Sequence, residues 1–352
     1  MEKIKVAIIG CGTIANAAHI PSYMKNPDVE IAYFCDIIPE RAEKAVKEYG
    51  CGKAVADYHD VINDPAVDAV SVCTPNGAHP MIAIDALRAG KHVLCEKPAA
   101  RTWAEVEKMI AAQHETGRIM AIGVVNRFND SVRKIKQYID EGRLGNVHHV
   151  YVSFRQHRSI PGLGGAFTTK AMAGGGVLID WGVHYLDIVM YCCGDPAPLT
   201  VSGECFSKLG RDIPGYTYKD MWAGPPKLDG TYDVEESVTG LVRTSGPVIT
   251  FNGAWAQNIA EKECFIDFMG DKAGIRLQYL GYFTLYTAEH GALVQYTPEF
   301  EMTDMFQNEI DAFVRSVQTG ERLPSVIDSV APTAKLMQAV YDSAEQHREI
   351  VL

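Results

Sequence analysis

The sequence predicts an α/β protein with two domains: a parallel sheet wound with helices, followed by an α/β domain with a large, open, mostly antiparallel sheet. Three observations lead to this prediction. At 352 residues the chain is long enough for about two domains with separate cores. Short β-rich runs alternate with helical patterns up to Gly123, and beyond it several β-rich runs follow one another without helices between them. We therefore expect domains at residues 1–123 and 124–352.

The elements of the first domain are bounded by recognisable start and stop residues. An apolar strand over residues 6–9 runs directly into a glycine turn. Two predicted helices, 39–50 and 80–90, each begin with proline and end with glycine, the usual asymmetry of helix ends. The near-continuous apolar run 67–73 is typical of a parallel strand covered on both faces. A Thr-x-x-Glu capping box opens the next helix, 102–117.

The second domain has a different order of predicted helices and strands. One helix is expected over residues 131–141. The strand candidates of this domain are 147–157, 200–207, 234–243, 248–257, 264–269 and 282–286. The segment 209–231 is rich in Gly, Pro and Tyr, and we expect a long ordered loop near a site or an interface.

The glycine turn after the first strand fits a dinucleotide fingerprint, G-x-G-x-x-G/A. Gly10 permits the tight turn, Gly12 lets a pyrophosphate approach bare backbone, and Ala15 allows the helix to pack closely on the strand. The second strand ends in Asp36, about 20 residues further on, where a carboxylate accepts the ribose hydroxyls. The alternative for Asp36 is a cap on the next helix. Ile37 and Ile38 stand where an extra phosphate would need basic or hydroxyl groups, which favours NAD over NADP.

Two more polar groups follow predicted strands of the same sheet. Thr74-Pro75-Asn76 comes after the strand 67–73, at the carboxyl edge where ligands bind, although a plain turn explains it equally well. Glu96-Lys97-Pro98 follows the next strand. Lys97 there could lie beside the nicotinamide and polarise a substrate oxygen. The alternative is an ordinary surface Glu-Lys pair.

The stretch from Lys170 to Asp187 is a glycine loop that enters a very apolar helix. At about 100° per residue, Asp180, His184 and Asp187 share one face of this helix. Two acids and an imidazole need partners when buried, and a cleft supplies them. The alternatives are that Asp180 serves the helix dipole and that His184 is an ordinary core histidine.

Composition and charge exclude several kinds of partner. The net charge of -11, without a basic cluster, argues against nucleic acid and anionic membrane surfaces. The nine scattered cysteines suggest reduced core residues of a cytoplasmic protein, and no signal peptide or membrane span is predicted. We expect no metal site, because Cys192-Cys193 lacks ligand spacing and His148-His149 on a strand point to opposite faces.

Taken together, these motifs resemble the glucose-fructose oxidoreductase and inositol dehydrogenase family (Gfo/Idh/MocA) over nearly the whole chain. The residues that carry the resemblance are Gly10-x-Gly12-x-x-Ala15, Asp36, Thr74-Pro75-Asn76 with His79, Glu96-Lys97-Pro98, Gly174-Gly175-Gly176, Asp180-x-x-x-His184, the Glu309-x-x-x-Phe313 helix and the Thr319-Gly320-Glu321 turn.

The resemblance implies a Rossmann domain joined to an α/β domain whose open sheet often mediates homo-oligomers. It also implies that Lys97 polarises the reacting oxygen and that His184, supported by Asp180, is the general acid/base. An imidazole suits that role because its pKa is near neutral. Because the family also contains non-catalytic sensors, a nucleotide-binding regulator is the main rival to an enzyme.

The expected site residues fall into three sets. The cofactor-binding set is Gly10, Gly12, Thr13, Ile14, Asp36, Thr74, Pro75, Asn76, His79, Glu96, Lys97 and Asn126. The substrate-binding set is Lys97, Arg158, Lys170, Asp180, Trp181 and His184. The catalytic set is Lys97, Asp180 and His184.

The expected activity is an NAD-dependent oxidation of a secondary ring hydroxyl of a sugar or glycoside. Planar donors and aromatic side chains near the glycine loop suit a polyhydroxylated ring. The sequence from Phe167 to His184 is similar to that of family members that oxidise the third ring carbon of a glucoside. A loop near residues 216–222 would accommodate the aglycone. The alternatives are an inositol or polyol dehydrogenase and an imine or enone reductase.

Overall fold

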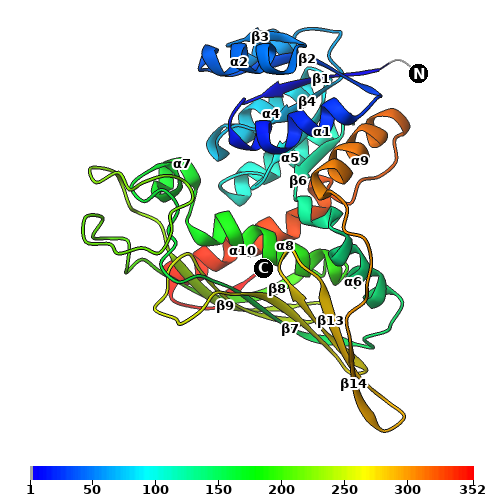
Figure 1. The fold of residues 1–352 in the computed structure, drawn as a ribbon, viewed down its shortest axis with the longest axis vertical. Helices are drawn as coiled ribbons and strands as arrows, with labels where there is room; N and C mark the ends of the chain where they lie inside the picture. The colour runs from blue at the N-terminus through cyan, green and yellow to red at the C-terminus, as the bar shows by residue number, and fades with distance from the viewer. Residues whose placement is uncertain (1–2) are drawn as a thin grey trace. The chain divides into compact units, whose positions relative to one another are not determined.

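The computed structural model describes residues 3–352, which form two compact units (Figure 1). Unit 1 consists of the chain up to Phe128 together with Thr303–Ala331. Unit 2 consists of Asn129–Met302 and Pro332–Leu352. Each unit has its own sheet, so the predicted pairing of a parallel α/β domain with a second, largely antiparallel one is confirmed.

Unit 1 contains a six-stranded parallel sheet in the order β3-β2-β1-β4-β5-β6. The strands are β1 (Ile4–Ile9), β2 (Val29–Cys35), β3 (Lys53–Val55), β4 (Ala69–Val72), β5 (His92–Glu96) and β6 (Met120–Gly123). The central strands consist almost entirely of buried aliphatic residues, as strands covered on both faces require. The strand order reverses between β1 and β4, and such switch points bind ligands at the carboxyl edge.

The helices of unit 1 begin and end largely where the sequence predicts. They are α1 (Ile20–Lys25), α2 (Pro39–Tyr49), α3 (Tyr58–Ile62), α4 (His79–Arg88), α5 (Trp103–Thr116) and α9 (Met305–Thr319). Gly50 ends α2 in a left-handed conformation, and Thr102 and Glu105 form the expected capping box of α5. A π-helical turn, Ala15–His19, leads into α1. Short 3-10 turns occur at Asn76–Ala78 and Val125–Phe128.

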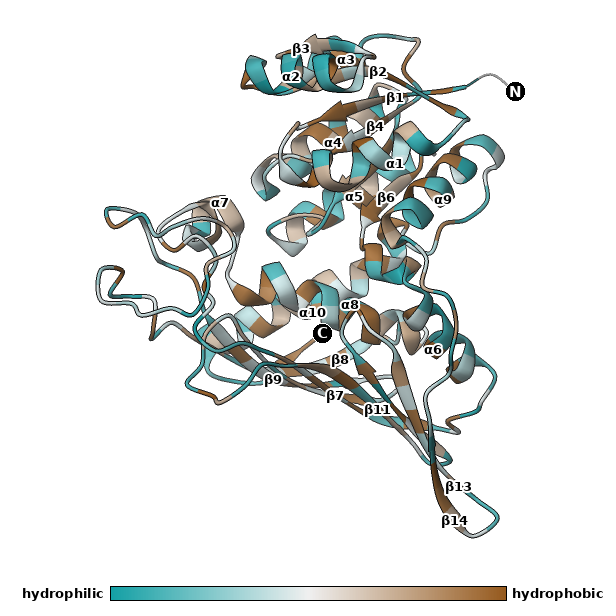
Figure 2. Cartoon of the chain, in the orientation of Figure 1, coloured by the Kyte–Doolittle hydropathy of each residue, from teal (hydrophilic) through white to brown (hydrophobic). Residues whose placement is uncertain are grey.

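The segment around α9 lies in unit 1, whereas the predicted division places it in the second domain. The reason is the apolar face of α9, whose Ile310 and Phe313 are buried in the same core as Ile20. Figure 2 shows apolar and polar residues alternating along this helix. Hydrogen bonds from Gln307 to the carbonyl of Ser22 and from Asn26 to Asp311 attach α9 to α1.

Unit 2 is built on a nine-stranded sheet in the order β14-β13-β12-β11-β7-β10-β9-β8-β15. The strands are β7 (Val147–Arg155), β8 (Pro198–Phe206), β9 (Ser237–Thr244), β10 (Val248–Ala254), β11 (Glu263–Gly270), β12 (Ala273–Gln278), β13 (Phe283–Glu289), β14 (Ala292–Tyr296) and β15 (Ile350–Val351). Only the β7–β10 pair is parallel among these described strands. No strand lies between Phe206 and Ser237, which confirms the predicted long loop.

Helices cover one face of this sheet (Figure 1). They are α6 (Asp130–Asp140), α8 (Val183–Cys192) and the part of α10 (Ile327–Gln346) that follows Ala331; a short α7 (Lys170–Ala173) precedes the glycine loop. Val150, Val152 and Phe154 of β7 pack with α8 in the core. The alternate residue Tyr151 lies on the other face and is half-exposed.

All nine cysteines are free thiols, and five of them are buried. Within residues 3–352, no helix combines the length and hydropathy that crossing a membrane requires.

Candidate cofactor and catalytic sites

The glycine turn of unit 1 has the backbone that its sequence implies. Gly10 has a φ of 93°, and a Cβ there would lie 2.6 Å from the carbonyl oxygen of Cys73, so no other residue fits. A Cβ at Gly12 would meet no atom within 4 Å, and Ala15 is fully buried against the strand. Thr13 is exposed and Ile14 half-buried at the start of the helix, whose first N–H groups lack helical acceptors. This turn fits a pyrophosphate.

Asp36 stands at the end of β2, next to the glycine turn. Its Oδ2 accepts a hydrogen bond from the Cys11 amide at 2.9 Å, and its Oδ1 accepts one from the Ile38 amide at the same distance. The side chain therefore anchors both the glycine turn and the residue that precedes α2, but it does not cap the helix, whose N-cap residue is Ile38 and has no side-chain capping hydrogen bond. An ionised carboxylate has about four acceptor positions, which leaves capacity for two ribose hydroxyls.

His79 joins the ends of β4 and β5 from the interior. Its Nδ1 lies 2.9 Å from the carbonyl oxygen of Pro98, and its Nε2 lies 2.8 Å from that of Thr74. Burial lowers the pKa of His79 and outweighs the opposite effect of the two carbonyl oxygens. The ring is fully buried and lies between the two loops. Beside it, Thr74 and Asn76 are half-buried and Pro75 is exposed.

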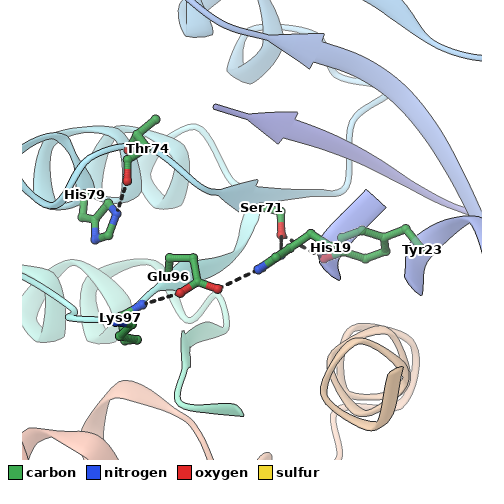
Figure 3. A network of polar contacts seen from close by, with 7 residues as sticks. All are labelled: His19, Tyr23, Ser71, Thr74, His79, Glu96 and Lys97. Carbon is green, nitrogen blue, oxygen red and sulfur yellow. Dashed lines mark hydrogen bonds and ion pairs between the residues drawn. The ribbon is translucent and has the colours of Figure 1, made fainter. Parts of the chain in front are cut away.

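Glu96 points into the protein rather than forming a surface pair with Lys97 (Figure 3). Its Oε1 lies 2.8 Å from Nε2 of His19, and its Oε2 accepts a hydrogen bond from the backbone N–H of Lys97 at 3.0 Å. Burial alone would raise the pKa of Glu96, but the hydrogen bond and charge of His19 lower it overall. Lys97 itself is half-buried at the strand end. Its position at the ligand edge agrees with the prediction.

His19 was not predicted as a site residue. Burial by itself lowers the pKa of His19, but its contacts with Cys73 and Glu96 raise it to about 10, which makes His19 and Glu96 a buried ion pair. The available signal was its spacing: His19 stands four residues after Ala15 and so faces the sheet on the same side of the helix.

Asn126, also predicted to bind the cofactor, lies in the 3-10 turn after β6 and is 2% exposed. The next residue, Arg127, is equally buried and donates hydrogen bonds to the carbonyls of Pro324 at 2.8 Å and Ser329 at 3.1 Å. This turn is thus an interior element of unit 1.

In unit 2 the predicted helix face divides into two parts. Asp180, Trp181 and His184 are half-buried, whereas Asp187 is 1% exposed and accepts a hydrogen bond from Thr333 at 3.2 Å. A π-helical turn over Leu178–Gly182 alters the regular spacing that the prediction assumed. Asp187 therefore belongs to the core, and Asp180 and His184 remain accessible for chemistry.

Asp180 is oriented by Trp255 at the end of β10, whose indole N–H donates to Oδ2 at 3.2 Å. Trp255 is fully buried and was not singled out from the sequence. A carboxylate held in this way on the turn before His184 suits the support of an imidazole that exchanges a proton.

Glu235 braces the glycine loop that starts this helix. Its Oε2 accepts from the Gly176 amide at 2.9 Å, and its Oε1 accepts from the Leu178 amide at 3.1 Å and from the Tyr341 hydroxyl at 2.8 Å. A Cβ at Gly176 would overlap the carbonyl oxygen of Glu235, and one at Gly175 would overlap the Tyr341 hydroxyl. Burial raises the pKa of Glu235 despite these bonds.

The remaining predicted substrate residues, Arg158 and Lys170, lie near the long loop of unit 2. The half-buried Arg158 has a φ of 57°, donates from Nε to Asn258 at 3.1 Å and lies 5.8 Å from the ring of Tyr216. Lys170 is exposed, and its backbone N–H donates to Asp233 at 2.6 Å.

The topology of the sheet therefore places several of the predicted cofactor residues at one edge. Parallel pairing of β2, β1, β4 and β5 places Asp36, the glycine turn, Thr74 and Lys97 along one edge of unit 1. Among residues 3–352 there is no group of three or more His, Cys, Asp or Glu side chains placed to hold a metal ion.

Comparisons with known proteins agree with this geometry. Residues 4–124 match the model "Oxidoreductase family, NAD-binding Rossmann fold", and residues 132–276 match the "GFO/IDH/MocA C-terminal domain". The chain is 30% identical to the D-glucoside 3-dehydrogenase of Escherichia coli K12, over 99% of this chain and 97% of that protein. It is 30% identical to the 1,5-anhydro-D-fructose reductase of Ensifer adhaerens, over 72% of this chain and 70% of that protein.

Among solved structures, the fold is similar to that of a levoglucosan dehydrogenase in complex with NADH and levoglucosan. The TM-score is 0.85 at 20% identity, with 99% of both chains covered. The full-length match to a relative at 30% identity and the two domain models in the expected order confirm the resemblance seen in the motifs. The chain thus belongs to the Gfo/Idh/MocA family of oxidoreductases, and residues 4–124 are its NAD-binding Rossmann domain.

Proposed function

We propose that this protein is an NAD-dependent dehydrogenase that oxidises a secondary ring hydroxyl of a sugar or glycoside. The observation that carries the proposal is that Asp180 and His184 are both half-buried at the start of one helix, with Asp180 held by the indole of Trp255. A sensor on the same fold would need no carboxylate oriented in this way. The full-length relative from Escherichia coli, named a D-glucoside 3-dehydrogenase, supports a carbohydrate substrate.

The residues take distinct roles in this reaction. Gly10 and Gly12 leave bare backbone for the pyrophosphate, and Asp36 accepts the ribose hydroxyls. The bound NAD supplies the hydride acceptor. His184 removes the proton of the substrate hydroxyl, since a base with a pKa near neutral serves this step best. Lys97 stabilises the negative charge that develops on the same oxygen.

Within this class, the substrate that the chain favours is a glucoside oxidised at the third ring carbon. The long loop of unit 2 supports a substrate with an aglycone, because Trp222 is 57% exposed and stands edge-on to Phe167, with ring centroids 4.9 Å apart. Such an aromatic pair offers an apolar surface beside the polar glycine loop.

We further propose a cytoplasmic homo-oligomer formed through the open face of the nine-stranded sheet. The half-exposed Tyr151 and Phe265 lie on this face as a cross-sheet aromatic pair, and Tyr286 is 44% exposed. The nine free thiols suit a reducing compartment.

The test is a substrate panel read by the absorbance of NADH, with the product identified by NMR. A ketone at the third carbon of a glucoside is the expected result. Faster turnover of inositol than of any glucoside would move the assignment to a polyol dehydrogenase. If NAD binds but neither a sugar nor a polyol reacts, the protein is a regulator and the proposal is wrong.

Two variants connect the activity to the residues. His184→Ala and Lys97→Ala should each lose at least ~100-fold in kcat, because a positioned proton-transfer group contributes about that much. Both should retain NADH affinity.

A further inference from the structure

We propose that His19 is a positioning residue for Lys97: through Glu96, it fixes the backbone turn from which the lysine side chain projects. This inference rests on the proposed role of Lys97 and adds a residue that no motif pointed to. Its basis is a buried polar chain that crosses unit 1 and ends at the backbone of Lys97 (Figure 3).

The chain of contacts passes through the interior of unit 1. Tyr23 on α1 has its hydroxyl 3.2 Å from the hydroxyl of Ser71 on β4. The same hydroxyl lies 2.9 Å from Nδ1 of His19, whose Nε2 is 2.8 Å from Oε1 of Glu96 on β5. Ser71 is fully buried, and Tyr23 and His19 are each 1% exposed, so solvent does not compete for these bonds.

The last link is the one that reaches Lys97. Oε2 of Glu96 accepts the backbone N–H of Lys97 at 3.0 Å, so the two oxygens of one carboxylate hold the imidazole on one side and the turn on the other. The direction of a side chain follows from the orientation of its own peptide. Fixing the Lys97 N–H therefore limits where its amine can lie.

Space and charge both favour this inward position of Glu96. Oε1 would lie 3.1 Å from a Cβ at Gly123 on β6, so the glycine leaves room for the carboxylate. Burial and the charge of Glu96 raise the pKa of Glu309 on α9 well above its usual range, so Glu309 is a neutral acid there. The imidazolium of His19 thus balances the charge of the Glu96 carboxylate. Without the imidazole, this buried carboxylate would be unpaired, and its side chain would rotate away or take up a proton.

His19 also lies on the helix that the glycine turn opens. The π-helical turn Ala15–His19 follows directly after the residues that fit the pyrophosphate. The His19 side chain therefore connects the helix that follows the glycine turn to the turn that carries Lys97. We expect His19 and Glu96 together to keep the Lys97 amine at a fixed position relative to bound NAD. A displacement of about 1 Å at a reacting group costs up to about 100-fold in rate.

The experiment compares His19→Ala, His19→Gln and Lys91→Met with the wild-type enzyme. Lys91 is the matched control: it precedes the same strand, is 5% exposed, and its amine donates to the carbonyls of Asp64 at 2.6 Å and Val67 at 2.8 Å, at the far end of β5 from the turn. We expect His19→Ala to lower kcat by about 10- to 100-fold with NADH affinity changed less than about threefold. His19→Gln retains a donor and should recover part of the loss, whereas Lys91→Met should lower the melting temperature without changing kcat.

A double-mutant cycle separates positioning from general loss of structure. In a Lys97→Ala background, His19→Ala should cause no further loss of kcat, because the residue through which it acts is gone. An equal loss in both backgrounds, or an unchanged kcat in the single variant, would overturn the proposal.

A second readout does not depend on any sugar being turned over. The lysines are dimethylated with a ¹³C label, and the Lys97 signal is assigned as the one missing in Lys97→Arg. That signal should shift in His19→Ala and remain in place in Lys91→Met. If the wild-type protein oxidises no sugar, the proposed function fails while this comparison still decides whether His19 positions Lys97, and an unmoved signal refutes it.

Discussion

Replacing Asp36 by alanine should weaken NADH binding and also destabilise unit 1, because one carboxylate serves both. The side chain anchors the Cys11 and Ile38 amides, each at 2.9 Å. Hydrogen bonds to a charged acceptor contribute about 1.5–3 kcal/mol each. The Ile38 amide lies at a half-exposed position, so a water molecule can replace the bond that it loses. Cys11 is 4% exposed, so its N–H would stay buried without a partner. We expect the free energy of unfolding to fall by about 2–4 kcal/mol.

The effect on the cofactor is larger and more specific. Loss of two ribose hydroxyl bonds to the carboxylate, at about 1.5–3 kcal/mol each, corresponds to at least about 100-fold in NADH affinity. The affinity for NADPH should not fall in parallel, since the carboxylate that repels its extra phosphate is gone. The ratio of the two affinities therefore separates direct contact from distortion of the glycine turn.

The assay is a fluorescence titration of NADH and NADPH well below the melting temperature, with urea unfolding of the same samples. Asp57→Ala is the control, because Asp57 follows β3 and caps α3 through the His59 amide, whereas Asp36 accepts the Cys11 amide of the glycine turn. It should lose about 1 kcal/mol of stability and no NADH affinity. Equal losses of NADH and NADPH affinity in Asp36→Ala would refute the assignment of Asp36 to the ribose and leave it as an anchor only.

Three further outcomes follow from buried groups. Because the raised pKa of Glu309 lets the folded protein hold a proton that the unfolded chain releases, wild-type stability should fall above about pH 4.5, by up to about 1.4 kcal/mol per pH unit. Glu309→Gln should remove this contribution, so that the stability of the variant falls less than that of the wild type between pH 5 and 8 in urea unfolding. Arg127→Met should lower the free energy of unfolding by about 3 kcal/mol, since two backbone carbonyls lose a charged donor, and denaturant titration measures it. Gly176→Ala should lower kcat by about 10- to 100-fold, because its Cβ overlaps the Glu235 carbonyl and shifts the helix start that carries the catalytic pair; a normal kcat would contradict this.

Local signals in the sequence were enough for most of the first sheet. Proline, glycine and capping residues have short-range effects, so the ends of α2 and α5 agree with the prediction to within a residue or so. Short strands were missed for the opposite reason. Lys53–Val55 is three residues long, mostly exposed and paired with β2 at the edge of the sheet, and nothing in its own residues marks it as a strand.

The candidate site was predictable where function fixes the residue type and unpredictable where tertiary packing does. Gly10, Asp36 and Asp180 stand in motifs whose spacing is set by local backbone. His19 and Glu235 act through partners many residues away, His19 through Glu96 and Glu235 through Gly176. No periodicity within one element could reveal those contacts.

The position of α9 has a consequence for synthesis of the chain. All six strands of unit 1 are translated before Asn129–Met302, the larger part of unit 2, and Met305–Thr319 follows only after that part. Until that moment the surface that Phe313 and Val314 cover is open, and Tyr23 and Ile20 lie beneath it. A nascent or truncated chain that stops at Phe128 thus carries an uncovered apolar patch, the kind that recruits chaperones and drives aggregation. The synthesis of the two units is therefore interleaved, because the core of unit 1 is complete only after most of unit 2 has been translated.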